Sequence, residues 1–269
     1  YYKVFGTEEL VRMPSITSVI SWRNKDKFKA WRKKVGEQEA NNITRKSTHR
    51  GTDAHTLIEE YLNNSDTFSD VLPLSQYLFK QAKPTLDRID NILCQEKSLW
   101  SFELGLAGSV DCIAEFDGEL AIIDFKTSRK PKKEEWIEDY YLQIAMYAMA
   151  HDYVYGSKIE QGVIMVCTPD LYYQEFKTEG ASLRAWKHKA LKRIDMYNEL
   201  MHDEKERIKT RNRQFLHSES RSKKEKLKMV KPPESIARSI SEPYLAHDGS
   251  KLEHPPGLIR GSESASPQI

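Results

Sequence analysis

Apolar and polar residues alternate in short runs through the middle of the chain, a pattern that predicts β-strands. The Asp117-Gly118 pair sits between two of these runs and is a strong hairpin signal. A second hairpin is expected around Thr168-Pro169-Asp170. The predicted strands lie near residues 98–105, 108–116, 119–126, 160–168 and 171–177.

Longer segments with helical periodicity surround and interrupt these strands. Ser15 or Thr17 is expected to cap the first helix, and Thr52 is a plausible N-cap for the second. The predicted helices span about 15–36, 51–63, 74–94 and 134–154, with a further charged helix from about Ser182 past Met201. This order suits an α/β fold, with a central mixed β-sheet flanked by helices on both sides.

The composition divides the chain into a folded domain and a tail. We expect a helical N-terminal part over residues 1–96, a core over 97–180 and a closing helix over 181–213. From residue 214 to residue 269 the sequence is rich in charge, Ser and Pro and has few large apolar residues. Such a segment cannot bury a core, so the tail is predicted to be disordered.

The overall charge does not by itself indicate a nucleic-acid-binding protein. The 269 residues include 42 Lys and Arg against 40 Asp and Glu, a formal net charge of +2. Residues 21–34, SWRNKDKFKAWRKK, are locally basic and carry Trp22, Phe28 and Trp31. This segment is equally consistent with a helix along a phosphate backbone and with an ordinary amphipathic helix.

Cysteine content and hydropathy argue against several classes of protein. Cys94, Cys112 and Cys167 are well separated and form no CxxC pair, which disfavours a disulfide scaffold or a zinc knuckle. Three thiols are also too few for a four-cysteine iron–sulfur cluster. No run is long and apolar enough to cross a bilayer, and no secretory signal pattern is present.

Three charged residues at the strand ends are the main candidates for chemistry. In IIDFKTS, Asp124 and Lys126 are two residues apart and therefore face the same side of a strand. The predicted hairpin can bring Asp111, from GSVDCIAEF, beside them. An Asp and a Lys two apart are more often a solvated ion pair. Here both acids lie at the ends of apolar strands. Burying a carboxylate there costs free energy unless a metal ion or a charged partner compensates for the lost hydration.

Several motifs in order resemble the RecB-like branch of the PD-(D/E)XK nuclease superfamily. They are RGTDAHTLIEEYL, GSVD, DFK and YYLQIAMYA. MPSITSVI near the start and DCIAEFDGELAIIDFKTSRKPK in the middle are similar to mitochondrial genome maintenance exonucleases and related bacteriophage exonucleases. The resemblance covers roughly residues 10 to 200. Val110 stands where the superfamily name has proline, as in the GxxD form of this branch.

The resemblance implies a role for each matching residue. Asp111, Asp124 and Lys126 would be catalytic, with His55, Asp111, Asp124 and the backbone carbonyl of Phe125 holding Mg²⁺ or Mn²⁺. Without the resemblance, a capping or core role would be favoured for His55. The residues expected to contact the substrate are Gln143, Tyr147, Arg50, Ser15 and Thr17.

The expected function is therefore metal-dependent hydrolysis of DNA by an exonuclease that prefers single strands with a free end, in replication, repair or recombination. The alternatives are a double-strand exonuclease, an endonuclease, a DNA-binding module that does not cut and a recruitment protein acting through its basic tail. The chain begins with Tyr1, which leaves open an upstream segment or transit peptide. An intracellular location is expected, either the mitochondrial matrix or the cytoplasm of a bacteriophage-infected cell.

Overall fold

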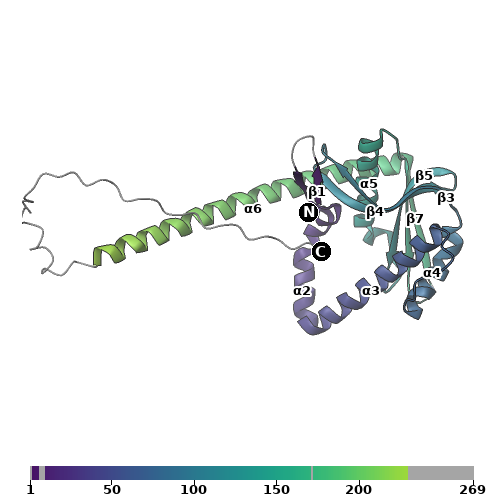
Figure 1. Cartoon of the computed structure of the whole chain (residues 1–269), viewed down its shortest axis with the longest axis horizontal. Coiled ribbons are helices and arrows are strands. Elements are labelled where there is room, and N and C mark those ends of the chain that lie inside the picture. Colours follow the sequence, from purple (N-terminus) through teal and green to yellow (C-terminus); the bar gives the residue numbers. More distant parts are fainter. Residues whose placement is uncertain (1, 6–9, 171, 230–269) are drawn as a thin grey trace, which may run out of the picture. The chain divides into compact units, whose positions relative to one another are not determined.

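The computed structural model describes residues 2–5, 10–170 and 172–229. Contacts divide the chain into one unit over Tyr1–Arg207 and a second over Ile208–Ile269. The first unit contains a five-stranded sheet with helices on both faces (Figure 1). This confirms the predicted α/β class with a mixed sheet.

The five strands lie in sequence order across the sheet. Neighbours are antiparallel except for the central pair, β5 and β6, which run parallel. A parallel pair needs a crossover connection, and here the connection is helix α5 (Glu138–Tyr155). The strands are β3 (Ile89–Ser101), β4 (Leu106–Phe116), β5 (Glu119–Thr127), β6 (Gln161–Cys167) and β7 (Tyr173–Glu179).

The N-terminal part is a hairpin followed by a series of helices. Strands β1 (Tyr2–Phe5) and β2 (Leu10–Met13) pair antiparallel, which the sequence patterns did not predict. Ser15 caps the first helix, as predicted, and its hydroxyl accepts the Ser18 N–H at 3.0 Å. The helices are α1 (Ile16–Ser21), a 3-10 turn η1 (Trp22–Asn24), α2 (Lys25–Val35), α3 (Glu37–Leu62) and α4 (Pro73–Leu86).

Helices cover the two faces of the sheet with separate apolar cores. Helices α3 and α4 pack on one face through residues such as Ile58, Leu78 and Leu86, which meet Ile123 and Phe125 of β5. Helices α1 and α5 and the first turns of α6 pack on the other face. Successive β5 residues therefore alternate between the two cores, as the period of a strand requires.

Helices α3 and α4 have other bounds than the sequence predicted, and the helix predicted over 15–36 is divided into α1, η1 and α2. Helix α3 begins at Glu37, so Thr52 lies inside the helix and is not its N-cap. Gly51 is tolerated there because a helix interior loses only about 1 kcal/mol at a glycine. The helix predicted over 74–94 ends at Leu86, and the residues from Ile89 onward form strand β3. The short 3-10 turn η2 (Glu134–Trp136) precedes α5.

The closing helix α6 (Gly180–Met229) is longer than predicted and continues through residues 214–229, which the composition assigned to the tail. Lys, Glu and Arg are good helix formers, so a charged segment can be helical without burying apolar surface. Residues 230–269 of the predicted tail lie outside the described residues. None of the described helices combines the length and the apolar character that crossing a bilayer requires.

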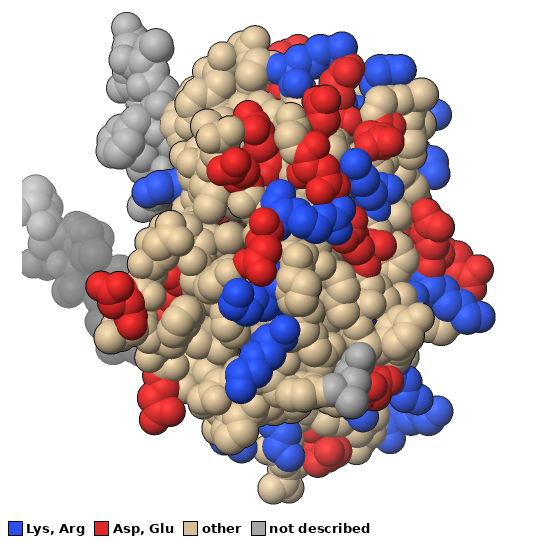
Figure 2. Space-filling view, turned by 90° about the vertical axis from the view of Figure 1, so that its right-hand side faces the viewer, with Lys and Arg blue, Asp and Glu red and all other residues tan. Residues whose placement is uncertain are grey.

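Charge is mixed on the molecular surface. On the face shown in Figure 2, Lys and Arg side chains are interspersed with Asp and Glu. One structural cluster joins three elements: the Arg88 guanidinium bonds Asp117 of the β4–β5 turn and Glu175 of β7. This arrangement agrees with the small net charge and indicates that any nucleic-acid site is local.

Two glycines give a prediction about stability. A methyl group at Gly162 of β6 would lie 2.1 Å from Cγ2 of buried Ile144, whereas one at Gly51 of α3 would meet only Thr127 Oγ1, at 3.9 Å. Gly162→Ala should therefore lower the free energy of unfolding by about 1–3 kcal/mol through overpacking. Gly51→Ala, as the matched control, should raise it by about 0.5–1 kcal/mol through helix propensity. Urea denaturation measures both, and equal effects of the two substitutions would contradict the packing described here.

Candidate active site

The candidate site lies where strands β4 and β5 separate. Their ladder runs from the Phe116–Glu119 pair to the Cys112–Ile123 pair and stops there. Beyond this point the Asp111 carboxylate takes the place of a strand carbonyl and accepts the Phe125 N–H at 2.9 Å. The end of the ladder therefore leaves an opening in the sheet, and an acid side chain occupies it.

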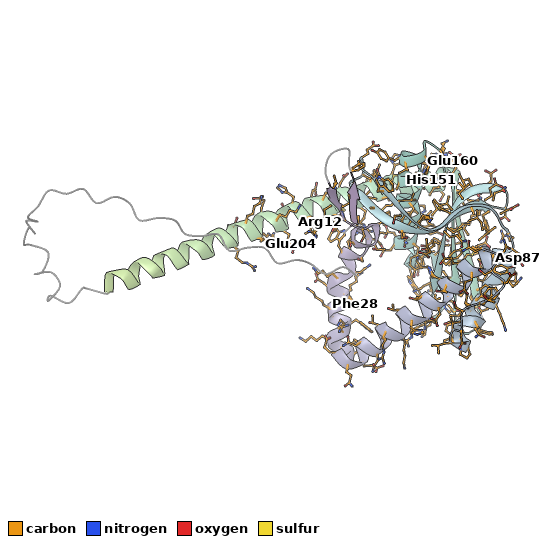
Figure 3. All side chains as sticks on the ribbon, viewed as in Figure 1. Arg12, Phe28, Asp87, His151, Glu160 and Glu204 are labelled. Carbon is orange, nitrogen blue, oxygen red and sulfur yellow. The ribbon has the colours of Figure 1, made fainter. Side chains whose placement is uncertain are left out.

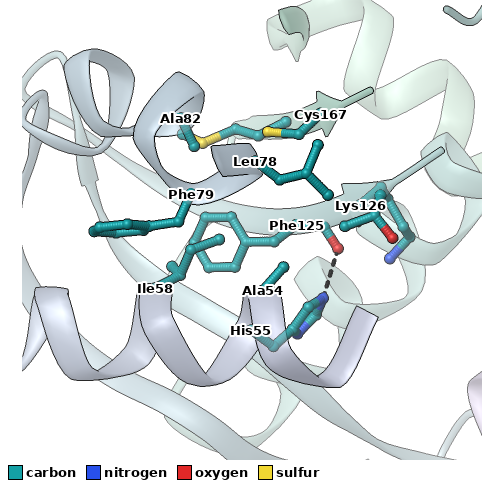
Figure 4. A pocket seen from close by; sticks show the side chains of 11 residues that line it. Ala54, His55, Ile58, Leu78, Phe79, Ala82, Phe125, Lys126 and Cys167 are labelled. Atoms are coloured by element: carbon teal, nitrogen blue, oxygen red, sulfur yellow. Dashed lines mark hydrogen bonds between the residues drawn. The ribbon is translucent and has the colours of Figure 1, made fainter. Parts of the chain in front are cut away.

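His55 reaches the same peptide unit from helix α3. Its Nε2 lies 2.8 Å from the Phe125 carbonyl oxygen and 3.9 Å from Asp111 Oδ2 (Figure 4). Its Nδ1 lies 3.3 Å from Glu96 Oε1. Burial lowers the pKa of His55, but the hydrogen bond with Glu96 and the charge of Asp111 outweigh it and bring the pKa to about 9. In this structure the imidazolium can thus donate from both nitrogens.

Asp124 and Lys126 form a close ion pair on the face of β5 against which α5 packs. The Lys126 ammonium donates to Asp124 Oδ1 at 2.5 Å, and the Asp124 residue is only 2% exposed. Burial raises the pKa of the Asp124 carboxyl, although the Lys126 charge opposes this. Burial lowers the pKa of Lys126, but Asp124 and Asp111 more than compensate, and the pKa lies above its ordinary value. Lys126 is therefore protonated.

The second oxygen of Asp124 has a different environment. Asp124 Oδ2 is buried and has no hydrogen-bond partner among the described residues. A buried carboxylate oxygen without a partner is costly and needs an explanation. The charges of Asp111 and His55 both act on the Asp124 carboxyl, and an unpartnered oxygen in this setting has the chemistry of a ligand position for a cation.

Glu96 belongs to this cluster, and the sequence patterns did not identify it. It lies on β3 between Gln95 and Lys97, which pair with Cys112 and Val110, so it stands opposite Asp111. Its φ of 47° is rare for a residue other than glycine and marks local strain. The ligand atoms of His55, Glu96 and Asp111 lie within 4.8 Å of one another. The geometry therefore adds a third acid to the site.

Tyr140 is a second residue that the patterns missed. It lies in the first turns of α5, with its ring centroid 5.5 Å from the Lys126 ammonium. An aromatic ring face attracts a cation at this distance. Lys126 is thus held between the Asp124 carboxylate and the Tyr140 ring.

The other predicted contact residues lie on α5 and at the start of α1. Tyr147 of α5 is 2% exposed, and its hydroxyl donates to the Ser109 carbonyl of β4. Gln143 is half-buried on the same helix. Ser15 is engaged as an N-cap and bonds Thr17 Oγ1 at 3.0 Å. Tyr147 and Ser15 thus have structural contacts, and substrate contact by these residues stays a prediction.

Arg50 lies on α3, five residues before His55. A methyl group at the next residue, Gly51, would meet Thr127 Oγ1, at the end of β5, at 3.9 Å. An open hollow of about 450 Å³ runs along this part of α3 and reaches His55 and Glu96; it is lined by Gly51, Thr52, His55, Thr56, Glu59 and Glu96. This hollow gives an extended chain access to the cluster.

The chain matches a known protein family over most of its length. A family model described as the PD-(D/E)XK nuclease superfamily matches residues 27–226. The chain belongs to this superfamily. The match includes His55, Asp111, Asp124 and Lys126, and it supports a nuclease function.

Curated relatives are exonucleases by name. The chain is 27% identical over 173 residues to human mitochondrial genome maintenance exonuclease 1, a match covering 59% of this chain and 50% of that protein. It is 31% identical over 171 residues to the Xenopus tropicalis protein of the same name, covering 61% and 48%. The chain thus matches about half the length of these relatives.

Solved structures show only weak overall similarity. The crystal structure of SSO0001 has a TM-score of 0.37 at 16% identity and covers 71% of this chain and 79% of its own. LHK-Exo in complex with dAMP has a TM-score of 0.30 at 12% identity and covers 60% and 84%. Scores this low support no conclusion about chemistry.

Proposed function

We propose that the protein is a divalent-metal-dependent DNA exonuclease that hydrolyses phosphodiester bonds in DNA replication, repair or recombination. The observation that carries this proposal is the buried Asp124–Lys126 pair beside the Asp111–Phe125–His55 cluster. It places two carboxylates, a peptide carbonyl, an imidazole and a lysine at one opening of the sheet. The exonuclease names of the curated relatives give the proposal its reaction type.

The donor set fits a divalent cation. Asp111, Asp124 through its unpartnered Oδ2, the Phe125 carbonyl and His55 would hold the ion, and Glu96 adds a further oxygen. Mg²⁺ and Mn²⁺ prefer oxygen ligands, and imidazole adds a nitrogen. Once bound, such an ion supplies Lewis-acid polarisation of a phosphate oxygen and a more acidic water. Since Glu96 and Asp111 bring the pKa of His55 to about 9, a cation held by a ring nitrogen of His55 would have to displace a proton from it.

Lys126 supplies the charge that the transition state needs. A protonated ammonium cannot act as a general base, so Lys126 stabilises the negative charge that develops on the phosphate or orients the attacking water. The Asp124 carboxylate and the Tyr140 ring fix its position in advance. Preorganised donors of this kind account for much of the rate enhancement in enzymes.

The alternatives differ in strand preference and in whether the protein cuts. A DNA-binding module that does not cut would be expected to have lost an acid or the lysine, and this chain retains all three. We favour single-stranded DNA with a free end over a duplex. The mitochondrial matrix and a phage-infected cell are both compatible settings, and the names of the curated relatives favour the former.

Lys126→Ala tests catalysis apart from binding. Cleavage of a labelled single-stranded oligonucleotide in Mg²⁺ or Mn²⁺ should fall by about 10²–10³-fold, because one transition-state donor is lost. Affinity for the uncut oligonucleotide should stay within about twofold. Lys158→Ala, which removes an exposed lysine paired with Glu160, is the control. Wild-type cleavage that survives exhaustive chelation, or near-normal turnover by Lys126→Ala, would refute the mechanism.

His55→Ala and Glu96→Gln test the proposed ligand set. Both should raise the metal concentration needed for half-maximal cleavage, by about 10–100-fold for a disturbed ligand shell. Glu103→Gln is the control, because Glu103 is exposed in the turn after β3. If His55→Ala needs the same metal concentration as the wild type for half-maximal cleavage, His55 has a purely structural role. Direct calorimetric titration with Mn²⁺ separates ligand loss from slower chemistry.

Strand preference depends on the basic aromatic segment. Phe28 of α2, labelled in Figure 3, is 47% exposed. Its ring stacks on that of Trp31, with the ring centroids 5.4 Å apart. Base stacking is worth about 1–3 kcal/mol per base and needs bases that a duplex hides. End-labelled linear single strands should therefore be cut faster than duplexes, and closed single-stranded circles should resist. Rapid cutting of circles would indicate an endonuclease, and a preference for blunt duplex ends would indicate a double-strand exonuclease.

A further inference from the structure

The loop between β5 and α5, residues 128–137, presents to solvent an aromatic ring that the catalytic scheme leaves unused. Trp136 is 60% exposed, although tryptophan is mostly well covered in folded proteins. The Lys133 ammonium lies 5.2 Å from the centroid of its ring. Tryptophan is enriched where a protein surface binds a partner, so this ring is a candidate contact.

Hydrogen bonds hold this loop in place along its length. The Ser128 N–H donates to the Cys167 carbonyl of β6 at 2.9 Å. The Gln174 side chain of β7 accepts the Lys132 N–H at 2.6 Å and donates to the Lys132 carbonyl at 2.8 Å. Ile137, the residue after Trp136, is fully buried in the core. The exposed ring therefore stands on an anchored backbone, which lowers the cost of ordering it in a complex.

Both ends of the loop lie beside Lys126. The loop begins two residues after this lysine, and it leads into α5, where the Tyr140 ring centroid is 5.5 Å from the Lys126 ammonium. The Trp136 N–H donates to the Lys133 carbonyl, and the Tyr140 N–H donates to the Ile137 carbonyl, both at 2.9 Å. These bonds make continuous turns, so Trp136 stands about one turn of backbone before the residue whose ring contacts Lys126. The loop therefore flanks the candidate site.

The loop is also basic. Its sequence, SRKPKKEEWI, has four basic residues and two acidic ones. Lys130 and Lys132 make no ion pair within the part of the chain that the structure describes. The ammonium of Lys133 lies 3.9 Å from Glu135, and both side chains are exposed, so this pair contributes little. An exposed ring among lysines has the chemistry that binds single-stranded nucleic acid, because bases stack on the ring and phosphates contact the ammonium groups.

We infer that Trp136 is a stacking platform for an unpaired base of the DNA strand beside the scissile phosphate, with Lys130 and Lys133 contacting phosphates of the same stretch. The inference rests on the proposed nuclease function and adds an aromatic contact separate from Phe28 of α2. Trp136 thereby determines specificity, because a paired base in a duplex has no free face to offer the ring.

Binding without cleavage gives the first test. The affinities of a fluorescent single-stranded oligonucleotide and of the matching blunt duplex are measured in chelator for wild type, Trp136→Ala and Trp136→Phe. Trp136→Ala should weaken single-strand binding about tenfold, because one base loses its stacking partner, and should change duplex affinity less than twofold. Trp136→Phe should recover part of the loss, because it keeps a ring face.

Tyr155→Ala is the matched control for the exposed ring. Tyr155 is 64% exposed and lies at the opposite end of α5, about 25 Å along the helix. Its removal should change neither affinity. Loss of single-strand affinity in Tyr155→Ala equal to that in Trp136→Ala would show a general effect of surface aromatics and contradict the inference.

The lysines are tested through salt. Lys130→Gln should lower the slope of log affinity against log salt by about 0.7, the value for one lost phosphate contact on a single strand. Lys158→Ala removes an exposed lysine that pairs with Glu160 and should leave the slope unchanged. An unchanged slope in Lys130→Gln would overturn the assignment of the phosphate contact.

A chemical change in the substrate locates the stacked base. Oligonucleotides with a single abasic site at successive positions are tested against wild type and Trp136→Ala. At one position the losses from the missing base and from Trp136→Ala should not add, because both remove the same stack. At the other positions the two losses should add.

The outcomes separate this inference from the proposed function. If the wild type cuts DNA and Trp136→Ala matches Tyr155→Ala in both affinities, the inference is wrong and the nuclease function stands. Equal losses for single strand and duplex, or additive losses at every abasic position, would also overturn it. If the wild type neither binds nor cuts DNA, the proposed function fails and the inference fails with it. Should Trp136→Ala fail to fold, Trp136→Phe decides through the same abasic series.

Discussion

Two hydrogen bonds to a single peptide unit, that of Phe125, hold the candidate site together. Asp111 of β4 accepts its N–H and His55 of α3 lies against its carbonyl, so three elements meet at one residue. The Phe125 ring packs with Ile58 and Leu78 in the apolar core beneath (Figure 4). Any shift of α3 over the sheet would therefore disturb the core and the cluster of donors together. The scaffold is rigid at the point where ligand positions must be exact to fractions of an ångström.

The Asp124–Lys126 pair shows that the site is not arranged for stability. Taking two charges out of water costs several kcal/mol per ion, and a single ion pair repays this only in part. Asp124 also keeps a buried oxygen without a partner. A folded protein retains such a group where its chemistry requires it, and unsatisfied buried polar groups concentrate at functional sites. A cation that binds only the folded state would offset this cost and stabilise the domain.

The sequence predicted the part of the site that depends on local pattern. Strand alternation and the Asp117-Gly118 turn were sufficient to bring Asp111 near Asp124 and Lys126, and β4 and β5 lie within two residues of their predicted bounds. Glu96 could not be found in this way, because residues 74–94 were expected to form a helix that ended just before it. Its position opposite Asp111 depends on a distorted backbone at φ 47° and on the register of β3 against β4, which are tertiary properties.

The start of helix α3 was also beyond what local sequence could predict. Gly51-Thr52-Asp53 has the composition of a helix start, yet the helix begins fourteen residues earlier, at Glu37. Packing against the sheet, rather than propensity, decides where such a helix begins. Because of the early start, Arg50 is helical and lies on the same continuous helix as His55. The resemblance to known nucleases named both residues but could not supply this relation between them.

The topology of the sheet accounts for the position of Tyr140 beside Lys126. Because β5 and β6 run parallel, the chain must cross over between them, and α5 is that crossover. The helix packs on the face of β5 that carries Asp124 and Lys126, so its first turns must lie close to the lysine. Tyr140 occupies this position, and its ring faces the ammonium. Gly108 permits the same helix to approach β4, since a methyl group there would lie 2.9 Å from the Tyr147 hydroxyl. The contact that seats α5 on the sheet thus also fixes the ring that holds Lys126 against Asp124.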